Sequence, residues 1–131
     1  MRPPLGSALV GGTAAGVVAA TMNALIYATG VIDQSVETPA GGPIPLGAVI
    51  IFSILPNIIG GTVYWALHRR VAAPLRTWRI VVAVVTVASF VTILGLEDAP
   101  VSMLVALSGM HIIAGAAAYV VTPTVAQRSA T

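Results

Sequence analysis

The charged side chains divide this sequence into alternating basic and acidic gaps between four long apolar stretches. All basic residues are arginines, and they lie before the first stretch, between the second and third, or after the fourth: Arg2, Arg69, Arg70, Arg76, Arg79 and Arg128. The acids occupy only the other two gaps: Asp33, Glu37, Glu97 and Asp98. Basic residues concentrate in the cytoplasmic loops of membrane proteins. The alternation therefore predicts four membrane spans with both termini in the cytoplasm.

The composition leads to the same class of protein. Hydrophobic residues make up 57% of the 131 residues and charged residues only 8%, whereas a soluble domain carries about 25% charged residues. Such a chain cannot cover a soluble core with polar surface, but it suits a lipid bilayer. We therefore interpret the net charge of +2 as a determinant of topology, carried by Arg69, Arg70, Arg76 and Arg79, and we expect no nucleic-acid partner.

The four apolar stretches predict an all-α, up-down bundle that forms one domain over residues 1–131. We place the spans at about 8–32, 46–68, 78–96 and 101–122, since about 20 residues cross a hydrocarbon core and helices satisfy their own backbone hydrogen bonds. The first stretch is longer than the core of a cleaved signal peptide, so we expect it to be retained. Trp65 and Trp78 mark one membrane interface.

Small residues recur at helical spacing and predict close helix packing. Gly and Ala at intervals of four let membrane helices approach each other closely. The rows lie in the first, second and fourth spans: Gly11, Gly12, Ala15, Gly16, Ala19, Ala20, Gly60, Gly61, Ala114, Gly115 and Ala118. We interpret such rows first as packing within one chain; the alternative is that one such face docks another subunit.

A few polar side chains interrupt the spans near the middle of the membrane, where facing lipid would cost energy. Asn23, Asn57, His111 and Ser108 form a candidate midplane polar site. The imidazole of His111 has several roles open to it: a hydrogen bond to one of the other three or to a backbone carbonyl, a proton relay, a ligand contact, or an axial ligand to a haem or chlorophyll-type pigment. Pro56 precedes Asn57 and predicts a helix kink, because it leaves the carbonyl of Phe52 without its helical donor.

Several chemistries lack the residues that they need. The chain has no cysteine, which excludes disulfides and thiolate metal sites. His68 lies at a span end and His111 at mid-span, so the two are poorly matched as haem ligands. No carboxylate lies within a span, and phosphate-binding loops, zinc motifs and dinucleotide fingerprints are absent from the sequence. We therefore predict no metal and no cofactor.

The order of motifs resembles a family of short four-helix membrane proteins, common in actinobacteria, that is known only as a domain of unknown function. The resemblance rests on the loop Ala40–Pro43, on Gly60-Gly61 followed by Trp65 and an arginine pair, and on His111 to Gly115. It implies a multi-pass protein of the bacterial plasma membrane, but it does not imply any particular activity.

Two function classes follow from these features. In the first, the protein is a structural or accessory subunit that packs through its small-residue faces in a larger membrane complex or a homo-oligomer. In the second, it binds or moves a small ligand, an ion or protons through the midplane polar site. A membrane enzyme is a third and less supported class, because the sequence offers no catalytic set.

Overall fold

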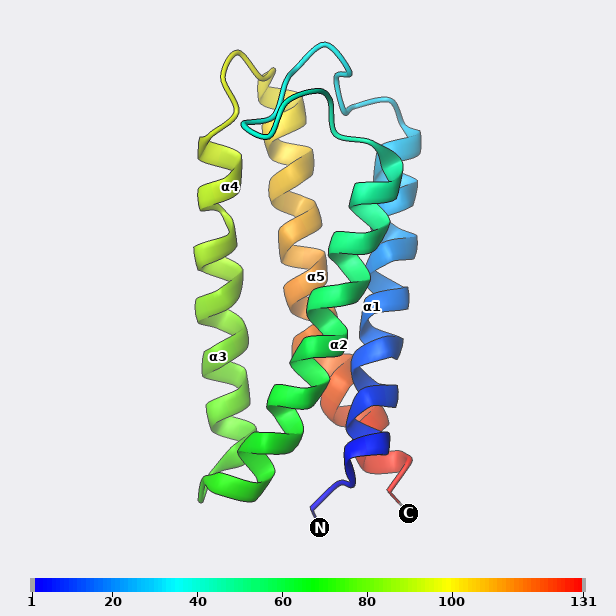
Figure 1. Ribbon diagram of the computed structural model, residues 1–131, viewed down its shortest axis with the longest axis vertical. Helices are drawn as coiled ribbons and strands as arrows, with labels where there is room; N and C mark the ends of the chain where they lie inside the picture. Colours follow the sequence, from blue (N-terminus) through cyan, green and yellow to red (C-terminus); the bar gives the residue numbers. More distant parts are fainter. Residues whose placement is uncertain (1, 131) are drawn as a thin grey trace.

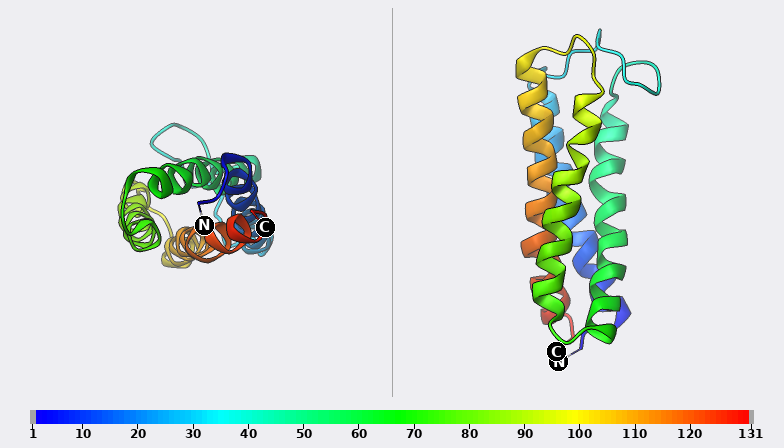
Figure 2. Two further views of the ribbon diagram at one scale, coloured as in Figure 1. Left: turned by 90° about the horizontal axis from the view of Figure 1, so that it is seen from below. Right: turned by 90° about the vertical axis from the view of Figure 1, so that its left-hand side faces the viewer.

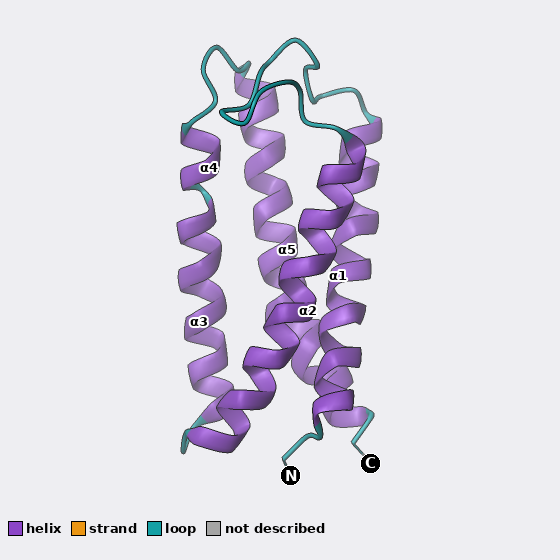
Figure 3. Ribbon diagram, in the orientation of Figure 1, coloured by secondary structure: helices purple, strands orange, loops and turns teal. Residues whose placement is uncertain are grey.

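The computed structural model describes residues 2–130 and consists of helices joined by loops, with no strand in that range (Figure 1, Figure 3). The helices are α1 (Leu5–Ala28), α2 (Leu46–Arg70), α3 (Pro74–Ser89), the short α4 (Val91–Leu94) and α5 (Val101–Arg128). Helices α3 and α4 together form one span, Pro74–Leu94, so residues 2–130 contain four helical segments long and apolar enough to cross a membrane. The predictions of an all-α fold and of a multi-pass membrane protein are confirmed.

The helix ends differ by several residues from the predicted span boundaries at some positions. The first helix ends at Ala28, before the predicted limit at Ile32, because Gly30 adopts a left-handed backbone conformation (φ 77°) that closes the helix. The last helix continues beyond the predicted end at Thr122 and carries Pro123 in its interior. A proline removes one backbone hydrogen bond, which a helix end can tolerate, and α5 turns away from α3 in this region (Figure 1).

The helices stand around a ring in which α1 neighbours α2 and α5, while α3 lies opposite α1 (Figure 2). The start of α1, the end of α5 and the turn between α2 and α3 lie at one end of the bundle (Figure 1). The loop that precedes α2 and the loop that precedes α5 lie at the other end. We call these the arginine end and the acidic end, after the charged residues that each carries. The alternation of charge along the sequence is thus a separation of charge in space.

Helix α1 is pressed against its neighbours backbone to backbone. A Cβ atom added to Gly11 would lie 2.5 Å from the carbonyl oxygen of Thr122 on α5, and one added to Gly61 would lie 2.5 Å from that of Ala8 on α1. Real Cβ atoms do not approach so closely, so both positions require glycine. Three alanines of α1 are fully buried: Ala8, Ala15 and Ala19.

The loop between α1 and α2 covers the acidic end of the bundle. Its aliphatic side chains Ile32 and Val36 are buried and pack in one cluster with Val49, Ile93, Met103, Leu107 and Met110. Tyr27 Oη donates a hydrogen bond of 3.2 Å to the carbonyl of Ile44 and ties the end of the loop to α1. The segment is polar in composition, yet its few apolar side chains fix it over the helices.

The third span is interrupted at Phe90, between α3 and α4. The backbone there forms short-range bonds, with Phe90 N donating to Val87 O and Ile93 N donating to Phe90 O. Hydroxyl groups supply further donors, because Ser89 Oγ bonds the Thr86 carbonyl at 2.6 Å and Thr92 Oγ1 bonds the Ser89 carbonyl at 2.8 Å. Side-chain hydroxyls are a usual means of satisfying an interrupted membrane helix.

Candidate functional site

Asn23 ties three helices together within the bundle. Its Nδ2 donates to Ser53 Oγ on α2 at 3.0 Å and to the carbonyl of Met110 on α5 at 3.3 Å. Ser53 Oγ in turn donates to the carbonyl of Val49 at 2.7 Å. Asn23 and Ser53 are each only 3% exposed. We call Asn23, Ser53 and Asn57, described next, the amide cluster.

Asn57 joins the cluster through the backbone of Ser53. Its Nδ2 donates to the Ser53 carbonyl at 2.8 Å, one turn earlier on the same helix. Pro56 lies inside α2, and the half of α2 nearer the arginine end leans toward α3 (Figure 1). The Oδ1 atoms of Asn23 and Asn57 are buried and accept no hydrogen bond within residues 2–130.

His111 lies apart from the amide cluster. Its imidazole is half-buried and packs beside the ring of Phe90, with ring centroids 5.8 Å apart. Ser108 Oγ donates to the carbonyl of Leu104 on its own helix, at 2.7 Å. The reason is the rotation of α5, since adjacent helical residues lie about 100° apart around the helix, and the part of α5 that meets Asn23 presents the backbone carbonyl of Met110. The structure therefore does not bring the four predicted polar residues together.

The predicted small residues lie at contacts between the chain's own helices. Gly12 faces the carbonyl of Asn57, Gly16 faces Ile54, and Gly115 faces Thr86 of α3. Gly60 lies against the ring of Trp78, with 3.2 Å between its added Cβ and the ring. The alanines of these rows are either buried or packed against buried clusters. Ala15, Ala19 and Ala20 are buried, Ala114 packs against the cluster of Ala15 and Ala19, and Ala118 packs against the cluster of Trp78 and Tyr64.

An aromatic group at the arginine end holds α3 to the bundle. Trp78 is 2% exposed, donates from Nε1 to the carbonyl of Ala118 at 3.2 Å, and meets Tyr64 edge to face at 5.4 Å. Gln127 Nε2 donates to Tyr64 Oη at 3.3 Å. The sequence placed Trp78 at the interface but did not reveal that it and Tyr64 form a buried anchor.

The arginines of the predicted turn lie together with the aromatic residues at that end. The guanidinium of Arg69 lies over the ring of Trp65 at 5.3 Å, and that of Arg79 lies over the ring of Tyr119 at 5.2 Å. Arg70 ends α2, and Arg76 lies in the first turn of α3. A guanidinium over an aromatic ring gains a cation–π attraction, which positions the charge without neutralising it.

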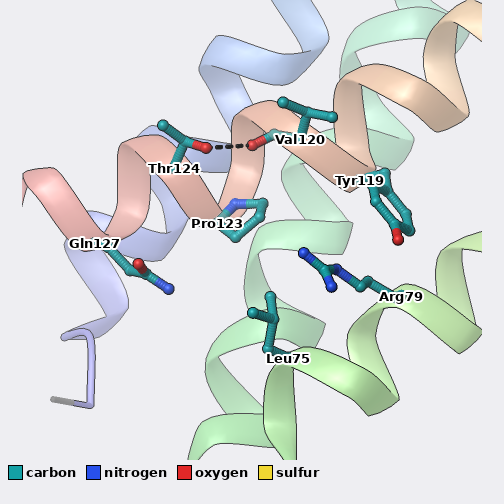
Figure 4. A pocket seen from close by; sticks show the side chains of 7 residues that line it. All are labelled: Leu75, Arg79, Tyr119, Val120, Pro123, Thr124 and Gln127. Atoms are coloured by element: carbon teal, nitrogen blue, oxygen red, sulfur yellow. Dashed lines mark hydrogen bonds between the residues drawn. The ribbon is translucent and has the colours of Figure 1, made fainter.

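Arg79 also borders a groove between α3 and α5 that the sequence did not predict (Figure 4). The groove has a volume of about 250 Å³. Its walls are two side chains one turn apart on α3 and five from the last turns of α5: Leu75, Arg79, Tyr119, Val120, Pro123, Thr124 and Gln127. The helical spacing of these residues is readable in the sequence, but the pairing of α3 with α5 is not.

Within residues 2–130, no group of three or more His, Asp or Glu side chains is placed to hold a metal ion. The family model for a family of unknown function, DUF6069, matches residues 3–131. The chain belongs to this family. The resemblance to a four-helix family of unknown function is thus confirmed. Membership of DUF6069 does not indicate any particular activity. No curated protein and no solved structure is significantly similar to the chain.

Proposed function

We propose that this DUF6069 protein is a structural or accessory subunit of a membrane assembly. The observation that carries the proposal is the amide cluster, in which Asn23 donates hydrogen bonds to two other helices, α2 and α5. Interhelical hydrogen bonds and small-residue contacts are the forces that assemble helices in lipid. The amide group of Asn23 therefore serves the chain's own assembly, and association with a partner would use the outer surface of the bundle.

The outer wall of the third span is the surface that we propose for this partner. Its side chains are among the most exposed apolar groups of the described chain, with Val87 at 73% and Leu94 at 84%. Only Trp78, Val82 and Ile93 of this span are buried. The valines are stiff at χ1, so they lose little side-chain entropy when another helix packs on them.

Cross-linking tests this surface cleanly, because the chain has no cysteine. A photoactivatable maleimide is attached to Val87→Cys, and to Leu25→Cys as the matched control. Leu25 is 66% exposed and lies on α1, across the ring from α3. We expect one discrete protein adduct in native membranes from Val87→Cys and only lipid adducts from Leu25→Cys. Lipid adducts from both positions would contradict the proposal.

A second function, ligand or proton binding at His111, is favoured by a separate observation. The imidazole is half-buried, has no hydrogen-bond partner within residues 2–130, and lies beside the interruption of the third span at Phe90. An intramembrane ionisable group without a structural partner is a candidate for proton or ligand traffic.

Nuclear magnetic resonance of labelled histidine separates the two functions. In a His68→Ala variant, His111 is the single histidine. A proton path requires that His111 titrate reversibly with bulk pH while the bundle remains folded. If the imidazole does not titrate, and if a His111→Ala variant loses only stability, the proton path is rejected and the structural function is retained.

We also propose that the arginine end faces the cytoplasm of a bacterial cell and that the protein resides in the plasma membrane. The separation of the arginines from the acids supports this orientation. A membrane-impermeant maleimide added to intact cells should label Ser35→Cys in the acidic-end loop and leave Arg70→Cys unlabelled until the cells are lysed. The opposite pattern would reverse the orientation.

A further inference from the structure

The groove between α3 and α5 carries a cation without a counter-ion. The guanidinium of Arg79 lies over the ring of Tyr119, and it has no hydrogen-bond or ion-pair partner within residues 2–130. No carboxylate side chain is within reach, because the four acids all lie in the loops of the acidic end. An arginine presents a planar fork of donors that matches phosphate.

The groove is also open to a ligand at the depth of the lipid headgroups. Arg79 lies little more than one turn inside the start of α3 at Pro74, near the ring of Trp78. Val120 lines the groove and is 58% exposed, so an apolar chain can lie beside it. Beyond Pro123, α5 diverges from α3 (Figure 1), and the groove lies beside this part of α5 (Figure 4).

We propose that this groove binds the phosphate of an anionic phospholipid, with Arg79 as the principal contact. The hydroxyl of Tyr119 and the side chains of Thr124 and Gln127 line the space in which the headgroup would lie (Figure 4). The aligned peptide dipoles of α3 place partial positive charge at its start, where no N-cap side chain accepts a hydrogen bond from the backbone. Basic pockets between membrane helices are known to hold anionic headgroups, and the surrounding arginines disfavour headgroups that carry an ammonium.

Native mass spectrometry of the detergent-solubilised protein tests the proposal. The probes are phosphatidylglycerol, phosphatidylcholine with the same acyl chains, and glycerol phosphate as the soluble phosphate. We expect phosphatidylglycerol to bind more tightly than the other two. Arg79→Gln should weaken its binding about tenfold, whereas Arg70→Gln, at the same end but outside the groove, should have little effect.

A second variant keeps the charge and fills the space. Thr124 bonds only the carbonyl of Val120 on its own helix, so Thr124→Leu should fold, occupy the groove and reduce phosphatidylglycerol binding, while Thr124→Ser should not. Thermal unfolding without added lipid checks that each variant is folded. If Arg79→Gln does not fold, the binding measured with Thr124→Leu tests the proposal on its own. Unchanged binding in the folded variants, an equal loss in Arg70→Gln, or glycerol phosphate binding as tightly as the lipid would each overturn the proposal.

Discussion

The contact between α1 and α2 predicts that a single added methyl group at Gly12 destabilises the protein. In Gly12→Ala the new Cβ would lie 3.1 Å from the Cα and N atoms of Gly61, and closer still to the carbonyl oxygen of Asn57. Ordinary carbon contacts begin at about 3.5 Å, so the two helices would have to separate by at least about 0.4 Å. Backbone atoms cannot rotate away, and the shift would also strain the hydrogen bond between Asn23 and Ser53.

The size of this effect follows from two opposing terms. Overpacking a well-packed site costs about 1–3 kcal/mol, whereas exchanging Gly for Ala in a helix gains up to about 1 kcal/mol. Gly109→Ala is the matched control, because a Cβ at Gly109 on α5 meets nothing within 4 Å. The control carries the same gain in helix propensity without the clash. The difference between the two variants is therefore the steric cost alone, about 1–3 kcal/mol.

Unfolding in mixed micelles with increasing dodecyl sulfate, followed by circular dichroism, measures the free energy of unfolding of each variant. We expect Gly12→Ala to be less stable than the wild type and Gly109→Ala to be equally or more stable. If Gly12→Ala matched Gly109→Ala in stability, α1 and α2 would not be in this contact, and the argument from small residues would fail.

Three further predictions concern other parts of the chain. Asn23→Leu should lower the free energy of unfolding by about 1–2 kcal/mol, because it removes two interhelical hydrogen bonds, and a double-mutant cycle with Ser53→Ala should reveal coupling. Hydrogen bonds from the Ser35 hydroxyl and backbone N–H hold the pKa of Asp33 below its ordinary value. Their contribution to loop stability should therefore be present above about pH 4 and be lost as the pH falls through the lowered pKa, and Ser35→Ala should raise the pKa of Asp33 measured by nuclear magnetic resonance. Trp78→Phe should remove the hydrogen bond to α5 and speed hydrogen exchange in α3 more than in α1.

Each of these predictions has a contrary result. Additive effects of Asn23→Leu and Ser53→Ala would mean that the two side chains do not interact. An unchanged titration in Ser35→Ala would remove the hydroxyl as a cause of the lowered pKa. Equal acceleration of exchange in α1 and α3 would show that Trp78 supports the whole bundle and not the third span in particular.

The sequence was sufficient for the number of spans and the separation of charge, because both depend on composition over about twenty residues. It was less sufficient for helix ends. Val31 and Ile32 continue the apolar run, yet Gly30 takes the chain out of the helix, and Pro123 does not end α5 although prolines often mark boundaries. Local backbone geometry decides these points, and hydropathy does not record it.

The candidate site was harder to predict because it depends on how each helix is rotated. Depth along a helix follows from counting residues, so Asn23, Asn57 and His111 were placed near the midplane. Their direction does not follow from counting, because a step of one residue turns the side chain by about 100°. For that reason Asn23 meets the backbone carbonyl of Met110, whereas the imidazole of His111 packs beside the ring of Phe90. The groove beside Arg79 needed the pairing of α3 with α5 as well.

The central claim is that the interhelical hydrogen bonds of Asn23 help to hold the bundle together and that, as we propose, the protein acts through the outer wall of its third span as a subunit of a larger assembly. The most direct test is the mass of the particle that carries the chain when native membranes are extracted into polymer-bounded discs and analysed by native mass spectrometry. We predict a mass larger than that of one chain, reduced to the single chain by Val87→Trp but not by Leu25→Trp. A wild-type particle that contains one chain alone would contradict the claim.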